Sequence, residues 1–122
     1  MSEPRIESFE DFWPYYVGAH RKPGCRALHY LGTTLSLSCV GLGIATANPL
    51  WFAAAPVAGY GCAWIGHFGL EGNKPATFGH PFYSLRGDFK MAYLALTGRM
   101  ADEVTRLYGS PNPEADAPLL AT

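Results

Sequence analysis

Hydrophobic and polar positions divide this chain into a long uncharged middle and two charged ends. No Asp, Glu, Lys or Arg occurs from Ala27 to Leu70, a run of 44 residues. The pair Asn48-Pro49 interrupts this run near its centre, where such a dipeptide favours a turn. The two remaining segments each have about 20 residues, enough to cross about 30 Å of hydrocarbon as a helix. The pattern predicts two membrane-spanning helices, residues 27–47 and 50–70, which form an antiparallel hairpin.

Small residues recur along one face of each predicted span. They follow one another mainly at steps of three or four and include one histidine per helix: His29, Gly32, Ser36 and Gly43 in the first, and Ala55, Gly59, Ala63 and His67 in the second. Stripes of small residues let membrane helices approach closely. We therefore expect the two spans to pack tightly against each other.

An amphipathic helix is predicted on each side of the hairpin. The first covers residues 3–20 and places aromatic residues on one face; Ser8 and Asp11 resemble a capping box, and Pro14 marks a later start or a kink. The second starts at about Leu85, with Ser84 as its N-cap, and continues through Gly98, which weakens it. Its apolar stripe comprises Phe89, Tyr93, Leu96, Met100, Val104 and Leu107.

The fold class predicted from these elements is all-α, an integral membrane hairpin of two spans flanked by two membrane-associated amphipathic helices. Residues 1–109 form one membrane-embedded domain, and residues 110–122, rich in proline, form a disordered tail. The basic residues that flank the spans are Arg21, Lys22, Arg26 and Lys74, whereas the turn at Asn48 has none. The positive-inside rule then places both termini in the cytoplasm, at the inner membrane of a bacterium or the endoplasmic reticulum of a eukaryote.

Composition excludes several other classes of protein. A net charge of −1 and a pI of about 6.4 argue against a nucleic-acid binder. The three cysteines, Cys25, Cys39 and Cys62, form no C-x-x-C pair and are expected to be small core residues. The first 11 residues carry four acids and one arginine, the wrong charge for a signal peptide.

The four histidines, His20, His29, His67 and His80, are the first candidates for chemistry. His29 lies 19 residues before Asn48 and His67 lies 19 residues after it, so equal arms of a hairpin bring both to the same depth. His20 and His80 follow across short segments and can join them at one end. Clustered imidazoles bind Zn, Fe, Cu or Ni. The alternative is that the four histidines make separate hydrogen bonds at helix contacts.

Glu71 follows His67 by one helical turn and lies on the same face. It is a candidate metal ligand, general base or partner that orients an imidazole; the alternative is a charge at a helix end. Asp88 is a weaker candidate. Lys74, Arg86 and Arg26 are candidates for binding an anionic head group, with snorkelling to the interface as the alternative.

Two strings carry a resemblance to a known family, "AHRKPGCRALHYLGT" and "AWIGHFGLEGNKPATFGHPFYSLRGDFKM". They resemble the small membrane proteins related to the fungal 2-hydroxy fatty acid dioxygenase, over about residues 9–100. The resemblance implies a membrane-integral, iron(II)-dependent enzyme that uses O2 to remove one carbon from a 2-hydroxy fatty acid. His20 and His29 match the first two histidines of that family, and His67 with Glu71 matches its G-H-x-x-x-E motif. His80 lies where the fungal members have a different pattern and the short bacterial-type members have this one.

These considerations define the predicted function and site. We expect His20, His29 and His67 to bind Fe(2+), with His80 as a fourth ligand or a neighbour of the ligands, and Glu71 to be catalytic. Lys74, Arg26 and Tyr30 are expected to contact the substrate, a long-chain 2-hydroxy fatty acid that reacts with O2 among membrane lipids. Nucleic acid is excluded as a partner, and self-association stays open.

Two other functions are compatible with the same residues. One is a non-catalytic membrane scaffold that binds a metal, and the other is a zinc-dependent lipid hydrolase, because histidine ligands do not distinguish zinc from iron. A di-iron desaturase or hydroxylase is disfavoured, because its H-x3-4-H and H-x-x-H-H boxes do not occur.

Overall fold

The computed structural model of the chain describes residues 6–120, which contain helices and turns and no strand. The predicted all-α class is thus confirmed for these residues. The contacts divide the chain into two compact units, each described here by itself. Unit 2 comprises Lys22–Pro75, and unit 1 comprises the residues before and after it.

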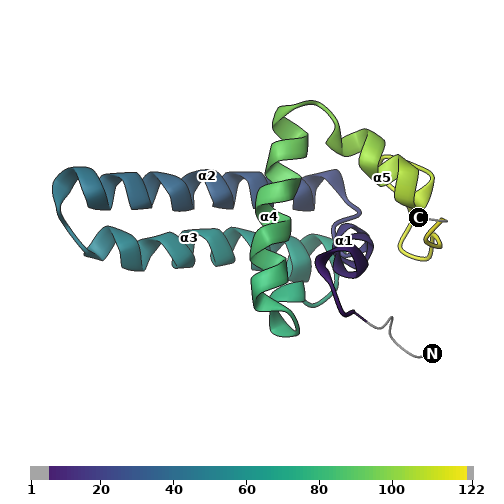
Figure 1. The fold of residues 1–122 in the computed structure, drawn as a ribbon, viewed down its shortest axis with the longest axis horizontal. Helices are drawn as coiled ribbons and strands as arrows, with labels where there is room; N and C mark the ends of the chain where they lie inside the picture. The colour runs from purple at the N-terminus through teal and green to yellow at the C-terminus, as the bar shows by residue number, and fades with distance from the viewer. Residues whose placement is uncertain (1–5, 121–122) are drawn as a thin grey trace. The chain divides into compact units, whose positions relative to one another are not determined.

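Unit 2 is a helical hairpin. Helix α2 (Pro23–Thr46) and helix α3 (Leu50–Ile65) run antiparallel and side by side, as Figure 1 shows. The turn between them uses Ala47 in the left-handed conformation, with a φ of 53°, and the side chain of Asn48, which accepts the backbone N–H of Leu50 at 3.1 Å. The predicted break at Asn48-Pro49 is therefore where the chain reverses.

Small residues allow the two helices of the hairpin to touch through their backbones. A Cβ atom added to Gly32 would lie 2.9 Å from the carbonyl oxygen of Gly59, which leaves no space for a side chain. The hydroxyl of Ser36 donates a hydrogen bond across the same contact to the carbonyl of Ala55, at 2.9 Å. The predicted close packing of the small-residue stripes is confirmed.

Among the described helices, α2 alone is long and apolar enough to cross a membrane. The second predicted span, residues 50–70, is divided: α3 ends at Ile65 after 16 residues, and a π-helix, η1 (Gly66–Glu71), continues it. The structure confirms the hairpin of helices, and the crossing of a membrane by both of them stays a prediction.

Unit 1 is built around helix α1 (Phe9–Gly18), which packs on α4 (Pro81–Leu96) and α5 (Met100–Tyr108). A short 3-10 helix, η2 (Ala76–Phe78), precedes α4. The side chains of Phe12, Tyr16 and Val17 have no exposed surface and form the centre of this unit. The predicted aromatic face of the first amphipathic helix is thus its buried face.

The start of α1 shows one half of the predicted capping box. The side chain of Ser8, the N-cap residue, accepts the backbone N–H of Asp11 at 3.3 Å, whereas the Asp11 carboxylate accepts the backbone N–H of Glu7, one residue before the N-cap, at 3.2 Å. Pro14 lies inside α1. Its carbonyl oxygen accepts a hydrogen bond from the hydroxyl of Tyr108 at 2.7 Å. Residues 3–5 of the predicted helix lie outside the described residues.

The second amphipathic segment differs from its prediction in two details. It forms two helices, because Gly98 adopts a φ of 72° between α4 and α5 and ends the first of them. The prediction of Ser84 as the N-cap was wrong, because α4 begins three residues earlier with Pro81, which suits the first turn of a helix. The Ser84 hydroxyl instead shares a hydrogen bond with Thr77 at 3.0 Å.

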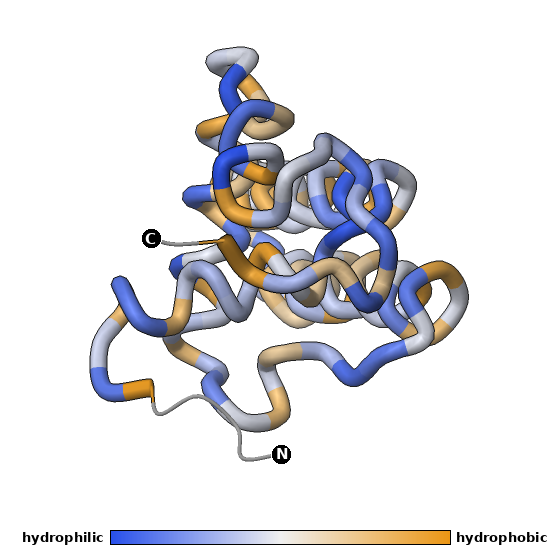
Figure 2. The backbone as a smooth tube through the Cα atoms, turned by 90° about the vertical axis from the view of Figure 1, so that its right-hand side faces the viewer, coloured by the Kyte–Doolittle hydropathy of each residue, from blue (hydrophilic) through white to orange (hydrophobic). Residues whose placement is uncertain are grey.

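The segment predicted to be a disordered tail makes contacts within unit 1. Arg21 donates hydrogen bonds to the carbonyls of Glu114 and Ala117, at 2.7 and 2.9 Å. The backbone N–H of Leu120 donates to the carbonyl of Leu107 at 2.7 Å. Figure 2 shows this stretch just before the C-terminus as apolar, which agrees with its packing against α5.

Candidate metal centre

His29 of α2 and His67 of η1 face each other across the hairpin. Their ring centroids lie 4.9 Å apart, the rings meet edge to face at 88°, and one nitrogen of each lies within 4.8 Å of the other. Both side chains are buried, with 4% and 2% of their surface exposed. The equal arms of the predicted hairpin place them together for a simple reason: antiparallel helices bring residues at equal distances from the turn to the same level.

Hydrogen bonds set the orientation and the tautomer of both rings. His29 Nδ1 lies 2.9 Å from the carbonyl oxygen of Cys25, and His67 Nδ1 lies 2.7 Å from Oδ1 of Asn73. Both partners are acceptors, so each Nδ1 carries the proton and donates it. In a neutral imidazole the lone pair then belongs to Nε2. An imidazole held through Nδ1 by an oxygen acceptor is typical of histidines that bind a metal.

The local chain path explains how Asn73 reaches His67. The carbonyl of His67 accepts the backbone N–H groups of both Gly72 and Asn73, at 2.7 and 3.1 Å. Gly72 adopts a φ of 73° and so turns the chain back at the end of η1. This turn carries the Asn73 amide over the ring of the histidine that it orients.

Gly66 allows η1 to approach α2 next to the histidine pair. A Cβ atom at this position would lie 2.9 Å from the sulfur of Cys25. Cys25 is fully buried and its carbonyl holds His29. The predicted role of Cys25 as a small core residue is consistent with this packing.

His20 follows α1 in unit 1 and shows the same arrangement as the other two histidines. Its Nδ1 lies 2.6 Å from the carbonyl oxygen of Tyr16, and its ring stacks on the Tyr16 ring with centroids 4.1 Å apart. Its side chain is 1% exposed. His20, His29 and His67 are therefore all buried, and each offers one ring nitrogen to a metal ion.

Tyr16 also connects to an acid. Its hydroxyl donates to a carboxylate oxygen of Asp88 in α4. Burial raises the pKa of Asp88 to about 6, against the hydrogen bond from Tyr16, which lowers it. A Cβ atom at Gly87 would lie 2.9 Å from the Tyr16 ring, so glycine at that position lets α4 reach this network.

His80, the fourth histidine, belongs to an aromatic cluster of unit 1. It is the N-cap residue of α4, is partly exposed, and lies 5.5 Å from the ring of Phe12 and 6.2 Å from that of Tyr83, measured between centroids. Its carbonyl accepts the backbone N–H of Ser84 at 2.8 Å. These contacts give His80 a role in packing, and its role toward a metal stays a prediction.

Glu71 ends η1 and lies near the start of α2. Its Oε2 accepts the backbone N–H of Lys22, the N-cap residue of α2, at 2.6 Å, and its carboxylate also hydrogen-bonds the side chain of Cys25. Burial raises the pKa of Glu71, although these hydrogen bonds lower it. The partner that orients His67 is thus Asn73, and Glu71 joins the two ends of the hairpin.

The predicted substrate contacts lie in different environments of unit 2. Arg26 is buried and shares a hydrogen bond with the hydroxyl of Tyr30, one turn further along α2. Lys74 is exposed. Sequence reasoning did not find the Cys25 carbonyl or Asn73 as partners of the histidines. Asn73 is part of the N-K-P-A motif and could have been considered as a partner from the sequence. A backbone carbonyl such as that of Cys25 cannot be predicted in this way, because every residue has one.

Three buried imidazoles whose Nδ1 atoms are held by oxygen acceptors form a group that could hold a metal ion. The chain belongs to the Mpo1-like family, described as "2-hydroxy-palmitic acid dioxygenase Mpo1-like", which matches residues 6–100. This confirms the resemblance noted from the sequence, and the family description implies a dioxygenase. No curated protein and no solved structure matches the chain.

Proposed function

We propose that this protein is a membrane-embedded, iron(II)-dependent dioxygenase that shortens a long-chain 2-hydroxy fatty acid by one carbon. The family description names the substrate class and the reaction type. One observation carries the proposal to this chain: His20, His29 and His67 each give the Nδ1 proton to an oxygen acceptor. All three imidazoles are then neutral donors through Nε2.

The proposed ligands of the iron are the Nε2 atoms of these three histidines. His20 lies two residues before Lys22, which caps α2, so the chain connects it directly to the hairpin that holds the other two. Imidazole nitrogen suits divalent iron as well as zinc, copper and nickel. Three neutral ligands leave the positive charge of the ion uncompensated, which favours an anionic carboxylate. When bound, the iron supplies the reaction with O2 and a chelation site for the hydroxyl and carboxylate oxygens of the substrate.

The residues around the hairpin ends are proposed to handle the substrate's charge and protons. Arg26 donates hydrogen bonds to the substrate carboxylate, and Tyr30 positions Arg26 through their shared hydrogen bond. Lys74, exposed after η1, attracts the carboxylate from the interface. Glu71 holds or passes a proton, and burial, which raises the pKa of its carboxyl group, favours this role.

Membrane embedding is proposed from α2 and from the surface of the hairpin. Only 17% of the most apolar stretch of α2 is buried inside the molecule. Large apolar side chains along the hairpin are instead exposed, including Ile44 at 71%, Leu50 at 73% and Val57 at 73%. Lipid would cover them, with both termini on the cytoplasmic side. Alkaline carbonate extraction of membranes tests this, because release of the chain into the soluble fraction would contradict it.

The activity is tested by oxygen uptake. Detergent-purified protein, reconstituted with iron(II), is supplied in air with 2-hydroxypalmitic acid or with palmitic acid, and products are identified by mass spectrometry. We expect only the hydroxy acid to consume O2 and to yield the acid one carbon shorter, because palmitic acid lacks the second chelating oxygen. Equal turnover of the two acids, or turnover of the hydroxy acid without oxygen, would show the proposal to be wrong.

A further inference from the structure

A cleft in unit 1 has no histidine among its lining residues. It has a volume of about 730 Å³ and is lined by residues of α1, α4 and α5. Four aromatic rings contribute to its walls, those of Phe9, Trp13, Phe89 and Tyr93. Three cations, Arg86, Lys90 and Arg106, and one acid, Glu10, line it as well. A cleft with both aromatic walls and an excess of positive charge suits a ligand that is itself amphipathic and anionic.

Two of the cations are held in place by aromatic rings. The guanidinium of Arg86 lies 4.1 Å from the centre of the Phe9 ring, and the ammonium of Lys90 lies 4.3 Å from that of Trp13. The two residues are one turn apart on α4, so their side chains are neighbours. Neither makes an ion pair with a carboxylate of the described residues. Both therefore retain N–H donors for an anion.

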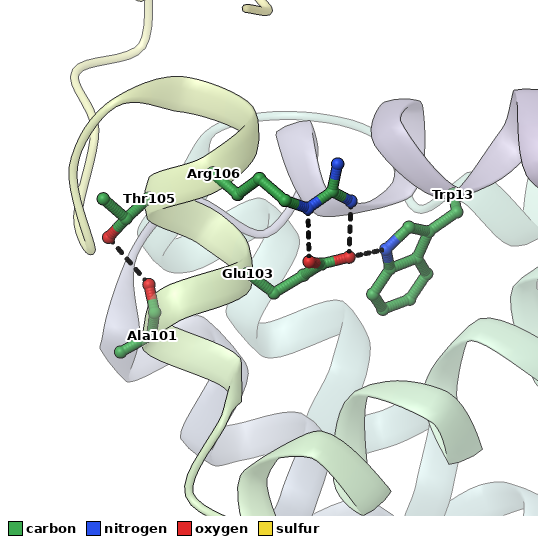
Figure 3. Close-up of polar contacts among 5 residues, drawn as sticks. All are labelled: Trp13, Ala101, Glu103, Thr105 and Arg106. Carbon is green, nitrogen blue, oxygen red and sulfur yellow. Dashed lines mark hydrogen bonds and ion pairs between the residues drawn. The ribbon is translucent and has the colours of Figure 1, made fainter. Parts of the chain in front are cut away.

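The third cation, Arg106, is already paired and fixes one wall of the cleft. Figure 3 shows its guanidinium on the carboxylate of Glu103, with N···O distances of 2.8 and 2.9 Å. The same carboxylate accepts the indole N–H of Trp13 at 2.7 Å. The hydrogen bond from Arg106 lowers the pKa of Glu103, which favours the charged carboxylate that pairs with Arg106.

The charges around Lys90 act on it in both directions. Burial lowers the pKa of its ammonium, and the positive charges of Arg106 and Arg86 lower it further. The carboxylates of Glu103 and Glu10 raise it. A bound anion between Arg86 and Lys90 would reduce the repulsion between these cations.

The same helix carries an exposed apolar stripe. Phe82 is 85% exposed, Leu85 49%, Phe89 47% and Leu96 88%. A helix with exposed apolar residues beside basic ones is typical of the membrane interface, where the basic residues meet lipid phosphates. Charge and apolar surface thus point to one occupant of the cleft, a membrane phospholipid.

We propose that this cleft binds the phosphate group of an anionic phospholipid. Arg86 and Lys90 donate hydrogen bonds to the phosphate oxygens, and the rings of Phe89 and Tyr93 contact the glycerol and the start of the acyl chains. The site stands on unit 1 alone and does not depend on the proposed dioxygenase reaction.

Trp13 provides a direct test, because it lines the cleft. In a Trp51→Phe, Trp64→Phe background it is the one tryptophan left in the chain. The full chain in a neutral detergent is titrated with dihexanoylphosphatidylglycerol, and tryptophan fluorescence is recorded. We expect a saturable change, and about tenfold weaker binding after either Arg86→Gln or Lys90→Gln, because each removes a charge-assisted hydrogen bond.

Matched variants and ligands separate the explanations. Lys90→Arg keeps the charge and should keep the affinity, whereas Lys22→Gln removes an exposed cation that does not line the cleft and should change little. Thermal unfolding of each variant identifies any that is not folded. If one of them is not, the affinities of Lys90→Arg and Lys90→Gln for the lipid are compared, and a lower affinity of Lys90→Gln supports the site. No saturable change with the lipid, or equal weakening by Lys22→Gln, would overturn the proposal. So would binding of inorganic phosphate as tight as that of the lipid, because the source would then be free phosphate.

Discussion

The rings of His29 and His67 meet edge to face, and each is anchored on the side away from its Nε2 atom. The carbonyl of Cys25 holds one ring and the amide oxygen of Asn73 holds the other. Cys25 belongs to α2, the helix that carries His29, and Asn73 belongs to the turn after η1. The pair is thus oriented by unit 2 itself, and this makes its behaviour testable residue by residue.

Replacing either histidine of the pair should abolish metal retention. His29→Ala and His67→Ala each remove one imidazole donor, and the remaining ligands are too few to hold iron through purification. Elemental analysis of the iron-loaded, detergent-purified variants measures the effect. His80→Ala, which alters an aromatic cluster of unit 1, is the control and should retain most of the metal. If His29→Ala or His67→Ala binds iron at the wild-type ratio, that histidine is not a ligand.

Removing the anchor of His67 should weaken metal binding without abolishing it. Asn73→Ala leaves the ring in place but removes the acceptor of its Nδ1 proton, and losses of about 10–100-fold in metal affinity are typical of such changes. Asn73→Asp keeps an oxygen acceptor and should bind nearly as tightly as the wild type. Competition with a metal chelator measures both affinities, and Asn112→Ala, at an exposed position, is the control. An unchanged affinity in Asn73→Ala would mean that the hydrogen bond does not orient a ligand.

The backbone contact between α2 and α3 predicts opposite effects for two glycines of the same helix. Gly32→Ala places a methyl group 2.9 Å from the Gly59 carbonyl, which is rigid backbone, so we expect a loss of about 1–3 kcal/mol in the free energy of unfolding. Gly41→Ala meets nothing within 4 Å and should stabilise the helix by up to about 1 kcal/mol. Thermal unfolding in detergent, followed by circular dichroism, compares them. Equal effects would argue against the tight contact.

Asp88 should make the protein less stable as the pH rises. Its pKa is raised from 3.8 to about 6 in the folded protein, so the folded state binds the proton more tightly than the unfolded state does. The resulting stabilisation is complete below about pH 4 and is lost as the pH rises through about 6, by up to about 3 kcal/mol.

The measurement is the unfolding free energy from pH 4 to 7 for the wild type and Asp88→Asn. The variant lacks the titrating group. The unfolding free energy of the wild type should therefore fall relative to that of Asp88→Asn as the pH rises from 4 to 7. Tyr16→Phe removes the hydrogen bond that lowers the pKa of Asp88 and should move the transition to higher pH. A pH profile that is identical in the wild type and Asp88→Asn would contradict the assignment.

The sequence predicted those parts of the structure that depend on helix geometry. The turn at Asn48, the contact of Gly32 with Gly59 and the pairing of His29 with His67 all follow from periodicity and from equal arms. The hydrogen bonds that orient the histidines did not follow, because they involve backbone carbonyls or a loop whose path depends on tertiary packing. Ser84 shows the limit for local signals: it is a good capping residue in isolation, but the proline three residues earlier starts the helix.

The π-helix η1 has a consequence for how length changes are tolerated at this site. A π-helical turn closes hydrogen bonds over one more residue than an α-helical turn, so it amounts to a one-residue insertion in the helix that α3 begins. Deleting a single residue between His67 and Gly72 would restore α-helical pairing and rotate everything after it by about 100° relative to His67. The side chain of Asn73 would then lose its hydrogen bond with Nδ1 of His67. A homologue that lacks this residue must orient the corresponding histidine with a different acceptor.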